Sequence, residues 1–464
     1  MATPSQALVN GQATQDEVER IPVPDEYLAA HVRVEDIAMF GDATDRDVRR
    51  SLRVGPVPMP ELAPDEALVA VMASSVNYNT VLTATFAPVP TFRFLQQFGR
   101  QGGWAARHDQ PYHVVGSDAA GVVQRVGSGV RHWKPGDHVV VSPAYVDDQE
   151  PGTHADGMLG AQQRAWGFET NFGGLAEYAI VRASQLVPKP ALLTWEEAAV
   201  NTLCAGTAYR MLVGEHGARL KQGDVVLIWG AAGGLGAYAV QFAKNGGALP
   251  IGVVTSQHSA DVLHRLGCDI VIDRAEIGLT DDAADDPDHV LEIGKKLGSI
   301  IRARIGRDPD IVFEHTGRAT FGISVFVVRR GGTVVTCGSS SGHQHSYDNR
   351  YLWMRLKRII GSHIASLQET WDCNRLIGLG HIVPTMSAVY PLSRLPEATR
   401  LVQTNQHTGK VAVLCQAPRP GLGVTDTALR HAVGEERLSP FRAPRPLMTQ
   451  RETKAGSRKV SPSG

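Results

Sequence analysis

The chain has 464 residues, of which 43% are hydrophobic and 20% are charged, and its formal net charge is −1. This length favours two or three domains, and the composition is that of an ordinary globular protein with a full apolar core. The near-neutral charge excludes the strong field that a nucleic-acid-binding or membrane-surface protein uses.

The five cysteines are scattered along the chain, and none forms a C-x-x-C pair. This pattern disfavours a disulfide framework and a structural zinc site, and it fits a reducing compartment. Residues 1–20 are polar, so we expect a disordered arm there, and no run approaches the length of a membrane span. We therefore expect a cytoplasmic protein without a membrane or nucleic-acid partner.

Short strand-like segments separated by glycine and proline turns fill residues 21–195. They predict a β-rich, barrel-like first domain. We expect residues 367–438 to return to this domain, with a last strand at 410–415. Residues 439–464 are basic, polar and rich in proline, which predicts a disordered tail.

Apolar strands alternate with helices over residues 196–366, beginning with a helix at 196–213. This alternation predicts a doubly wound parallel sheet, so the fold class is α/β. The connection at 275–307 is unusually long. It contains an acidic run at 281–288, which precedes an amphipathic helix predicted at 290–305.

The segment Asp224–Gly236, with the sequence DVVLIWGAAGGLG, joins a buried strand to a helix through a glycine-rich turn. Backbone N–H groups and the positive end of a helix dipole bind a pyrophosphate at such a turn. The competing interpretation is a tight turn without a ligand. We expect the dinucleotide to contact Gly230, Ala232, Gly233, Gly234, Leu235 and Gly236.

The second strand of this unit ends at Thr255 and Ser256 without the acidic residue that holds the ribose of NAD. Their hydroxyl groups accommodate a 2′-phosphate, which favours NADPH over NADH. The acidic residue Asp261 follows closely and disfavours a bound 2′-phosphate, whereas no Lys or Arg follows closely. Arg274 is a candidate for the positive charge that such a phosphate needs. Further expected cofactor contacts are Thr207, Gly338 and Ser339.

The whole pattern resembles the medium-chain dehydrogenase/reductase superfamily, in which a GroES-like catalytic domain is interrupted by a Rossmann domain. Ser117 and Asp118 stand where zinc alcohol dehydrogenases carry His and Glu, and no cysteine precedes Cys204. The ligand set for a catalytic zinc is therefore missing. The resemblance points to a zinc-free branch that reduces activated double bonds.

More specifically, residues 22–435 resemble the crotonyl-CoA carboxylase/reductase family. The resemblance is carried by the segments at 75–79, 164–172, 310–317, 337–342, 348–353 and 361–363. It implies that NADPH reduces a 2-enoyl-CoA and that the resulting enolate captures CO2, giving an alkylmalonyl-CoA such as ethylmalonyl-CoA. It also implies no zinc, no biotin, and a homotetramer built as a dimer of dimers.

The resemblance places Asn79, Phe168, Glu169 and His363 at the CO2 site. Asn79 and His363 would donate hydrogen bonds to CO2, Phe168 would exclude water, and Glu169 would orient a water or a neighbouring donor. Taken singly, each has a plainer interpretation. Asn79 suits a turn, Phe168 a core, Glu169 a solvated surface, and His363 the end of a strand.

Four residues near the end of the nucleotide domain are candidates for the CoA phosphates, although a solvated basic face is equally consistent with them. They are Arg350, Tyr351, Lys357 and Arg358. Ile364 and Ser366 depart from the family pattern in the expected wall of the acyl pocket. Crotonyl-CoA is the default substrate, and a longer or branched enoyl-CoA that supplies polyketide extender units is the competitor.

Two other functions remain open on the sequence. A plain NADPH-dependent enoyl-CoA or quinone reductase would protonate the enolate, and the set of four CO2-site residues argues against it. A non-catalytic nucleotide-binding protein would be favoured by loss of the loop glycines, which are all present.

Overall fold

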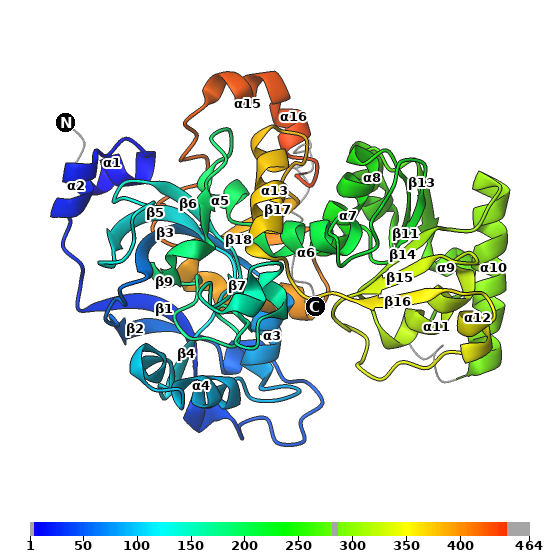
Figure 1. Ribbon diagram of the computed structural model, residues 1–464, viewed down its shortest axis with the longest axis horizontal. Coiled ribbons are helices and arrows are strands. Elements are labelled where there is room, and N and C mark those ends of the chain that lie inside the picture. Colours follow the sequence, from blue (N-terminus) through cyan, green and yellow to red (C-terminus); the bar gives the residue numbers. More distant parts are fainter. Residues whose placement is uncertain (1–3, 281–285, 443–464) are drawn as a thin grey trace, which may run out of the picture.

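A sheet of seven strands forms the centre of the first domain in the computed structural model, which describes residues 4–280 and 286–442 (Figure 1). Six strands follow the order β10-β6-β5-β3-β18-β17, and β9 pairs with β3. Neighbours are antiparallel except β17 and β18. The strands are β3 (Glu66–Val76), β5 (Ala120–Val126), β6 (His138–Val141), β9 (Tyr178–Arg182), β10 (Leu186–Pro188), β17 (Met386–Pro391) and β18 (Lys410–Leu414).

Strand β3 is the central strand of this domain, and every one of its residues is buried. A three-stranded sheet and a short strand pair surround the main sheet. These strands are β1 (Glu26–Arg33), β2 (Arg53–Pro58), β4 (Tyr112–Val114), β7 (Ala144–Tyr145) and β8 (Arg164–Ala165). The helices of this domain are α3 (Tyr78–Thr85), α4 (Phe92–Gly99), α5 (Trp195–Ala198) and α14 (Leu395–Gln403).

The second domain contains six parallel strands in the order β13-β12-β11-β14-β15-β16. The strand order reverses between β11 and β14, which is where α/β sheets bind ligands. The strands are β11 (Val225–Ile228), β12 (Leu249–Val254), β13 (Ile270–Asp273), β14 (Ile311–Glu314), β15 (Thr333–Thr336) and β16 (Arg358–Gly361).

Helices cover both faces of this sheet, because apolar side chains of β11 point alternately to its two faces. Val226 and Ile228 belong to the apolar cluster on the side of α6 and α7, whereas Val225 and Leu227 belong to the cluster with α10 and α11. The helices are α6 (Thr202–Leu212), α7 (Gly234–Asn245), α8 (Gln257–Arg265), α9 (Arg274–Ile277), α10 (Pro287–Ile305), α11 (Arg318–Val327) and α12 (Asn349–Trp353).

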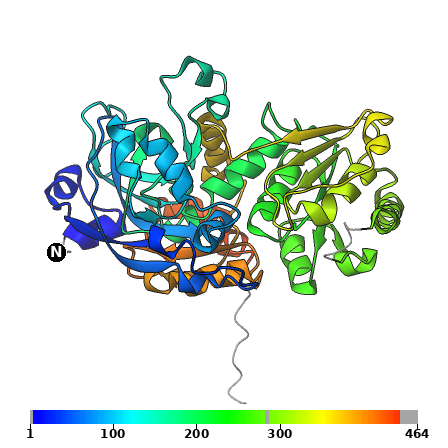
Figure 2. The same ribbon diagram turned by 90° about the horizontal axis from the view of Figure 1, so that it is seen from below.

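The two domains lie side by side in both views (Figures 1 and 2) and share one apolar cluster. This cluster contains Met72 of β3, Ala120 of β5, Ala205 of α6 and Tyr238 of α7. The chain leaves the second domain through α13 (Leu367–Gly378), which packs against α6, and β18 then pairs with β3. Helices α15 (Thr427–Val433) and α16 (Glu435–Leu438) follow.

The predicted α/β class, a β-rich domain joined to a doubly wound parallel sheet, is confirmed. The helix expected at 196–213 is instead two helices, α5 and α6, separated at Ala199–Asn201. The amphipathic helix expected at 290–305 begins earlier, because Asp286 caps α10 and Pro287 occupies its first turn.

The prediction of a disordered arm at 1–20 is wrong for the described part, which forms α1 (Pro4–Asn10) and α2 (Gln15–Arg20). Thr14 and Glu17 make a reciprocal capping box at the start of α2. Leu8 and Val18 are buried in the cluster that both domains share. Because this segment is mostly polar, its composition does not indicate that these two apolar side chains are buried.

The predicted tail is also partly ordered, since Phe441 is buried against Ala237 and Val262. Residues 443–464 of that tail, and residues 281–285 of the acidic run, lie outside the described residues. Within the described ranges, no helix is both long enough and apolar enough to cross a membrane.

Candidate active site

The glycine-rich loop after β11 has the backbone geometry of a phosphate cradle. Gly230 has a φ of +54°, in the left-handed region that favours glycine. A Cβ on Gly236 would lie 2.4 Å from the carbonyl oxygen of Gly230, so the tight turn tolerates no side chain there. Gly233 is the N-cap of α7 and has no side chain, so no side-chain acceptor caps the first N–H groups of that helix and they can bind an anion.

The other expected cofactor residues lie on elements next to this loop. Gly338 follows β15 with a φ of +68°, and the Ser339 hydroxyl donates to the Gly338 carbonyl oxygen at 2.6 Å. Thr207 is buried on α6, and its hydroxyl has no hydrogen-bond partner among the described residues. An orphaned buried hydroxyl is the group that a bound ligand satisfies, so these residues fit a dinucleotide.

Thr255 and Ser256 are exposed at the end of β12, and the first turn of α8 carries no acidic residue. The Ser256 hydroxyl caps α8 by accepting from the Ser259 N–H at 3.2 Å. Arg274 donates from Nε to the carbonyl oxygen of Leu279 at 3.2 Å. Of the two hydroxyl groups expected to bind the 2′-phosphate, that of Ser256 already caps a helix, so that of Thr255 is the more available.

Asn79 lies in the first turn of α3, rather than in a turn after the strand. Its Nδ2 donates to the Ser117 hydroxyl at 2.7 Å, and that hydroxyl donates to the Trp166 carbonyl oxygen at 2.6 Å. Asn79 Oδ1 is buried and has no partner within the described part of the chain. The Asn79 amide is thus held next to the segment that leads to Phe168.

Phe168 and Glu169 lie in a turn that follows β8, and both are half-buried. The Phe168 ring packs against Phe94 with 6.0 Å between ring centroids. The Glu169 carboxylate turns back to accept from the Ala165 N–H at 2.7 Å. This bond fixes the carboxylate and leaves its second oxygen for another donor.

His363 follows β16 and is exposed. Desolvation lowers the pKa of His363, the Glu169 carboxylate opposes that shift, and Arg210 reinforces it. A lowered pKa favours the neutral imidazole, which carries one N–H donor.

The candidates for CoA contact lie elsewhere. Arg358 is the first residue of β16 and pairs with Thr333, so it lies at the end of the sheet opposite to the glycine-rich loop. Lys357 Nζ donates to the carbonyl oxygens of Val325 and Phe326 at 2.8 and 2.9 Å, and burial lowers its pKa to about 8.

The side chains of Arg350 and Tyr351 also make local contacts. Arg350 forms an exposed ion pair with Asp348 at 2.7 Å, and Tyr351 packs edge-on against Phe326. The structure therefore does not bring these candidates beside the glycine-rich loop, and their assignment stays a prediction.

The residues that hold the Phe168 turn could not be predicted from a motif. The His113 ring contacts the Thr170 carbonyl oxygen at 3.1 Å and the Thr91 hydroxyl at 2.8 Å, and burial lowers its pKa to about 4. Asn171 Oδ1 accepts from the Val114 N–H at 2.8 Å. The available signal was a polar residue inside an apolar strand, since His113 is completely buried.

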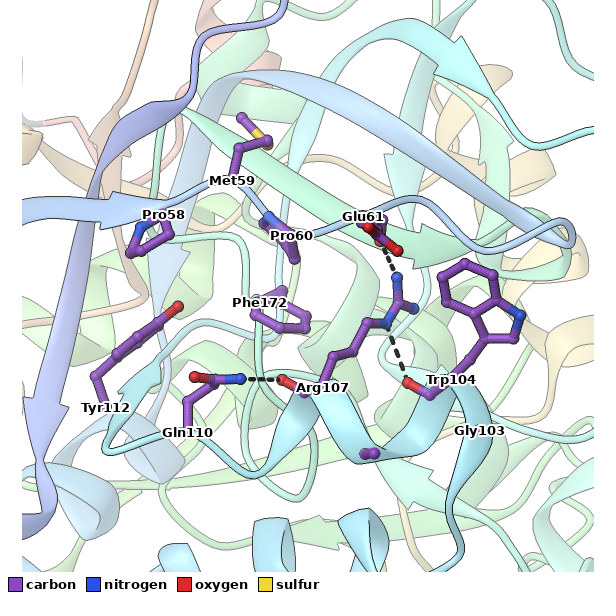
Figure 3. Close-up of a pocket in the computed structure, with 11 residues that line it drawn as sticks. Pro58, Met59, Pro60, Glu61, Gly103, Trp104, Arg107, Gln110, Tyr112 and Phe172 are labelled. Carbon is purple, nitrogen blue, oxygen red and sulfur yellow. Dashed lines mark hydrogen bonds between the residues drawn. The ribbon is translucent and has the colours of Figure 1, made fainter.

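A separate cavity of about 560 Å³ opens on the first domain (Figure 3). Trp104, Arg107 and Tyr112 contribute to its walls, together with Phe172. None of the predicted site residues lines it, although Phe172 belongs to the same segment as Phe168. Among the described residues, no group of three His, Cys, Asp or Glu side chains is placed to hold a metal ion.

Two family models match the chain. Residues 63–191 match the alcohol dehydrogenase GroES-like domain, and residues 234–377 match the zinc-binding dehydrogenase domain. The chain is 52% identical over 429 residues to a crotonyl-CoA reductase of Streptomyces avermitilis, covering 91% of this chain and 96% of that protein. It is 40% identical over 381 residues to a crotonyl-CoA carboxylase/reductase of Cereibacter sphaeroides, covering 80% and 86%.

Among solved structures, the 2-octenoyl-CoA carboxylase reductase CinF, in complex with NADP and 2-octenoyl-CoA, superposes with a TM-score of 0.93. It shares 66% sequence identity and covers 95% of this chain and 99% of its own. A crotonyl-CoA carboxylase/reductase named AntE, in complex with NADP, has a TM-score of 0.76 and 35% identity over 86% of this chain and 96% of its own. The chain therefore belongs to the crotonyl-CoA carboxylase/reductase family of medium-chain dehydrogenases/reductases.

Proposed function

We propose that the protein catalyses the NADPH-dependent reductive carboxylation of a 2-enoyl-CoA to an alkylmalonyl-CoA. The observation that carries this proposal is the 66% identity, over 95% of the chain, to a 2-octenoyl-CoA carboxylase reductase. Family membership supports NADPH as the reductant, and the fit of the glycine-rich loop and Thr207 supports a dinucleotide at that position.

NADPH supplies a hydride to the β-carbon of the enoyl thioester when it is bound. The electron pair of the double bond moves to the thioester carbonyl as an enolate, and the α-carbon forms a carbon–carbon bond with CO2. Gly230 and Gly236, with the first turn of α7, would bind the pyrophosphate, and Thr207 would hydrogen-bond to the nucleotide. Thr255 and Ser256 would hold the 2′-phosphate.

The side chains around the α-carbon decide whether CO2 or a proton meets the enolate. Asn79, held on Ser117, and the neutral imidazole of His363 donate to the CO2 oxygens, where carboxylate charge develops. Phe168 excludes water from the same space, which denies the enolate a proton source. Glu169 accepts from the Ala165 N–H, and its remaining oxygen would orient a water or a neighbouring donor.

We further propose that the preferred acyl chain is longer than that of crotonyl-CoA. The relative that acts on 2-octenoyl-CoA shares 66% identity, compared with 52% for a crotonyl-CoA reductase. Ile364 is buried with Ala144 and Val146 in a small apolar cluster directly after His363, and it suits the wall of an acyl pocket. Such a product would serve as a polyketide extender unit.

The remaining contacts of the substrate are also proposals. Arg350 and Arg358 are exposed and have guanidinium groups that suit CoA phosphates, and Tyr351 follows Arg350 in the sequence. Lys357 is a weaker candidate, because its ammonium is bonded to the end of α11. The five cysteines are all unpaired, which supports a cytoplasmic location.

We propose a homotetramer in which nucleotide-binding domains pair through β16. This strand is at the edge of the six-stranded sheet, and beside it lie three exposed apolar side chains, those of Trp353, Met354 and Leu356. An open strand edge next to apolar surface favours association. Native mass spectrometry tests this, and a monomer at micromolar concentration would contradict it.

The function is tested by incubating the protein with NADPH, labelled bicarbonate and carbonic anhydrase, in parallel with crotonyl-CoA and 2-octenoyl-CoA. We expect labelled ethylmalonyl-CoA and hexylmalonyl-CoA, with the higher kcat/KM for 2-octenoyl-CoA. Butyryl-CoA and octanoyl-CoA as sole products would overturn carboxylation. A higher kcat/KM for crotonyl-CoA would overturn the chain-length proposal alone.

A further inference from the structure

A buried ion pair connects Lys410, the first residue of β18, to Asp118, which precedes β5. Lys410 Nζ lies 3.1 Å from Asp118 Oδ2, and the two side chains are 3% and 0% exposed. The ammonium also donates to the carbonyl oxygen of Val76 at 3.1 Å and to Asn77 Oδ1. Its three N–H donors therefore have three protein acceptors, and none is left for a phosphate.

The Asp118 carboxylate gathers donors from both domains. Its Oδ2 accepts from the Ser75 hydroxyl and from Asn77 Nδ2, each at 2.7 Å, at the end of β3. Its Oδ1 accepts from the Thr202 hydroxyl at 2.7 Å and from the Leu203 N–H at 2.9 Å, at the start of α6. We call Ser75, Asn77, Asp118, Thr202 and Lys410 the Asp118 network.

Lys410 of this network also contacts the glycine-rich loop, which we call the nucleotide loop. A Cβ on Gly234 would lie 2.8 Å from Lys410 Cδ, so the aliphatic stem of Lys410 lies against that glycine. The preceding residue, Gly409, donates its N–H to the carbonyl oxygen of Ala232 at 2.8 Å. The start of β18 is thus in direct contact with the loop that cradles the pyrophosphate.

The opposite end of the network adjoins the CO2 site. Ser117, the neighbour of Asp118, accepts the hydrogen bond of Asn79 Nδ2, and Asn77 is two residues before Asn79. The Ser74 hydroxyl donates to the Asp118 carbonyl oxygen at 2.6 Å, so the backbone at Asp118 is also bonded to β3. The Asp118 carboxylate therefore bonds Asn77, two residues before Asn79, and Asp118 directly follows Ser117, which accepts from the Asn79 amide.

We propose that Lys410 and Asp118 are positioning residues that hold the nucleotide loop in register with Asn79. This inference rests on the proposed reductive carboxylation, in which the hydride and CO2 must reach adjacent carbons of one substrate. A displacement of about 1 Å between the two binding sites lowers such a reaction on the order of 10²-fold. The ammonium of Lys410 and both carboxylate oxygens of Asp118 are already bonded within the protein, so neither group is available to hydrogen-bond the substrate.

The test compares the wild type with Lys410→Met and with the double variant Lys410→Met/Asp118→Asn. The double variant removes both charges and leaves no unpaired charge buried, so we expect it to be more stable than the single variant. We expect the double variant to raise the KM for NADPH and to lower the ratio of carboxylated to saturated product about 10²-fold. A purely structural role would lower the amount of folded enzyme and leave both quantities unchanged.

Arg430→Met is the matched control, because it removes the partner of another buried carboxylate. Arg430 Nη1 lies 2.7 Å from Glu197 Oε2, and Glu197 is buried on α5. We expect this variant to lose stability while keeping the wild-type KM and product ratio. A double variant with the wild-type KM for NADPH or the wild-type product ratio would overturn the proposal. A wild type that forms no carboxylated product would overturn the proposed function instead, and the KM for NADPH would still test the contact with the loop.

Discussion

Truncation of Asn79 should separate the catalytic effect that we propose for it from its structural effect. In Asn79→Ala the amide that donates to Ser117 is lost, but the Ser117 hydroxyl keeps its own donor bond to the Trp166 carbonyl oxygen. No buried donor is therefore stranded, and the free energy of unfolding should fall by only about 1 kcal/mol. Asn79 Oδ1 has no partner among the described residues, so its loss adds no further cost.

The effect on the product should be much larger. Removal of one preorganised donor from a site where negative charge develops costs about 10²–10³ in rate, which corresponds to about 2.7–4 kcal/mol. Hydride transfer does not use this donor, so NADPH oxidation should continue while the saturated acyl-CoA replaces the alkylmalonyl-CoA.

The assay measures NADPH consumption at 340 nm and both products by mass spectrometry, with Thr83→Val as the control. Thr83 lies one turn further along α3, and its hydroxyl has no partner in the described structure. We expect the control to keep the wild-type product ratio. The reasoning fails if Asn79→Ala keeps that ratio, or if unfolding free energy and carboxylation fall by the same amount.

Three further predictions follow from the same geometry. Phe168→Ala should admit water and raise the share of saturated product while NADPH oxidation changes less; equal losses in both rates would contradict this. Glu169→Gln removes the charge that raises the pKa of His363, so this pKa should fall further below its ordinary value. The acid limb of the carboxylation profile at fixed dissolved CO2 should then move to lower pH, and a shift to higher pH would refute the sign. Gly236→Ala places a Cβ 2.4 Å from the Gly230 carbonyl oxygen and should weaken NADPH binding at least about tenfold, as measured by fluorescence titration; unchanged affinity would contradict the cradle.

The parallel sheet and its glycine-rich loop could be predicted from the sequence because their signals are local. Five consecutive apolar residues and a spaced set of glycines define β11 and the turn into α7 without reference to the rest of the chain. The fold of the N-terminal segment could not be predicted in this way. Its anchors, Leu8 and Val18, have meaning only through the apolar cluster that both domains supply.

The candidate site shows the same division. The family-matched segments predict Asn79, Phe168, Glu169 and His363 as site residues, but no local pattern indicates that Ser117 accepts from Asn79. Positioning by Lys410 is less visible still, because it depends on contacts between residues 292 positions apart in the sequence. Long-range hydrogen bonds of this kind are set by the tertiary fold rather than by a sequence motif.

The most direct test of the central claim is the stoichiometry of carbon fixation. With 2-octenoyl-CoA, saturating dissolved CO2 and carbon-13 bicarbonate, the account predicts close to one labelled carboxyl group in hexylmalonyl-CoA for each NADPH oxidised. NADPH oxidation that yields unlabelled octanoyl-CoA would contradict it and identify the protein as a plain enoyl-CoA reductase.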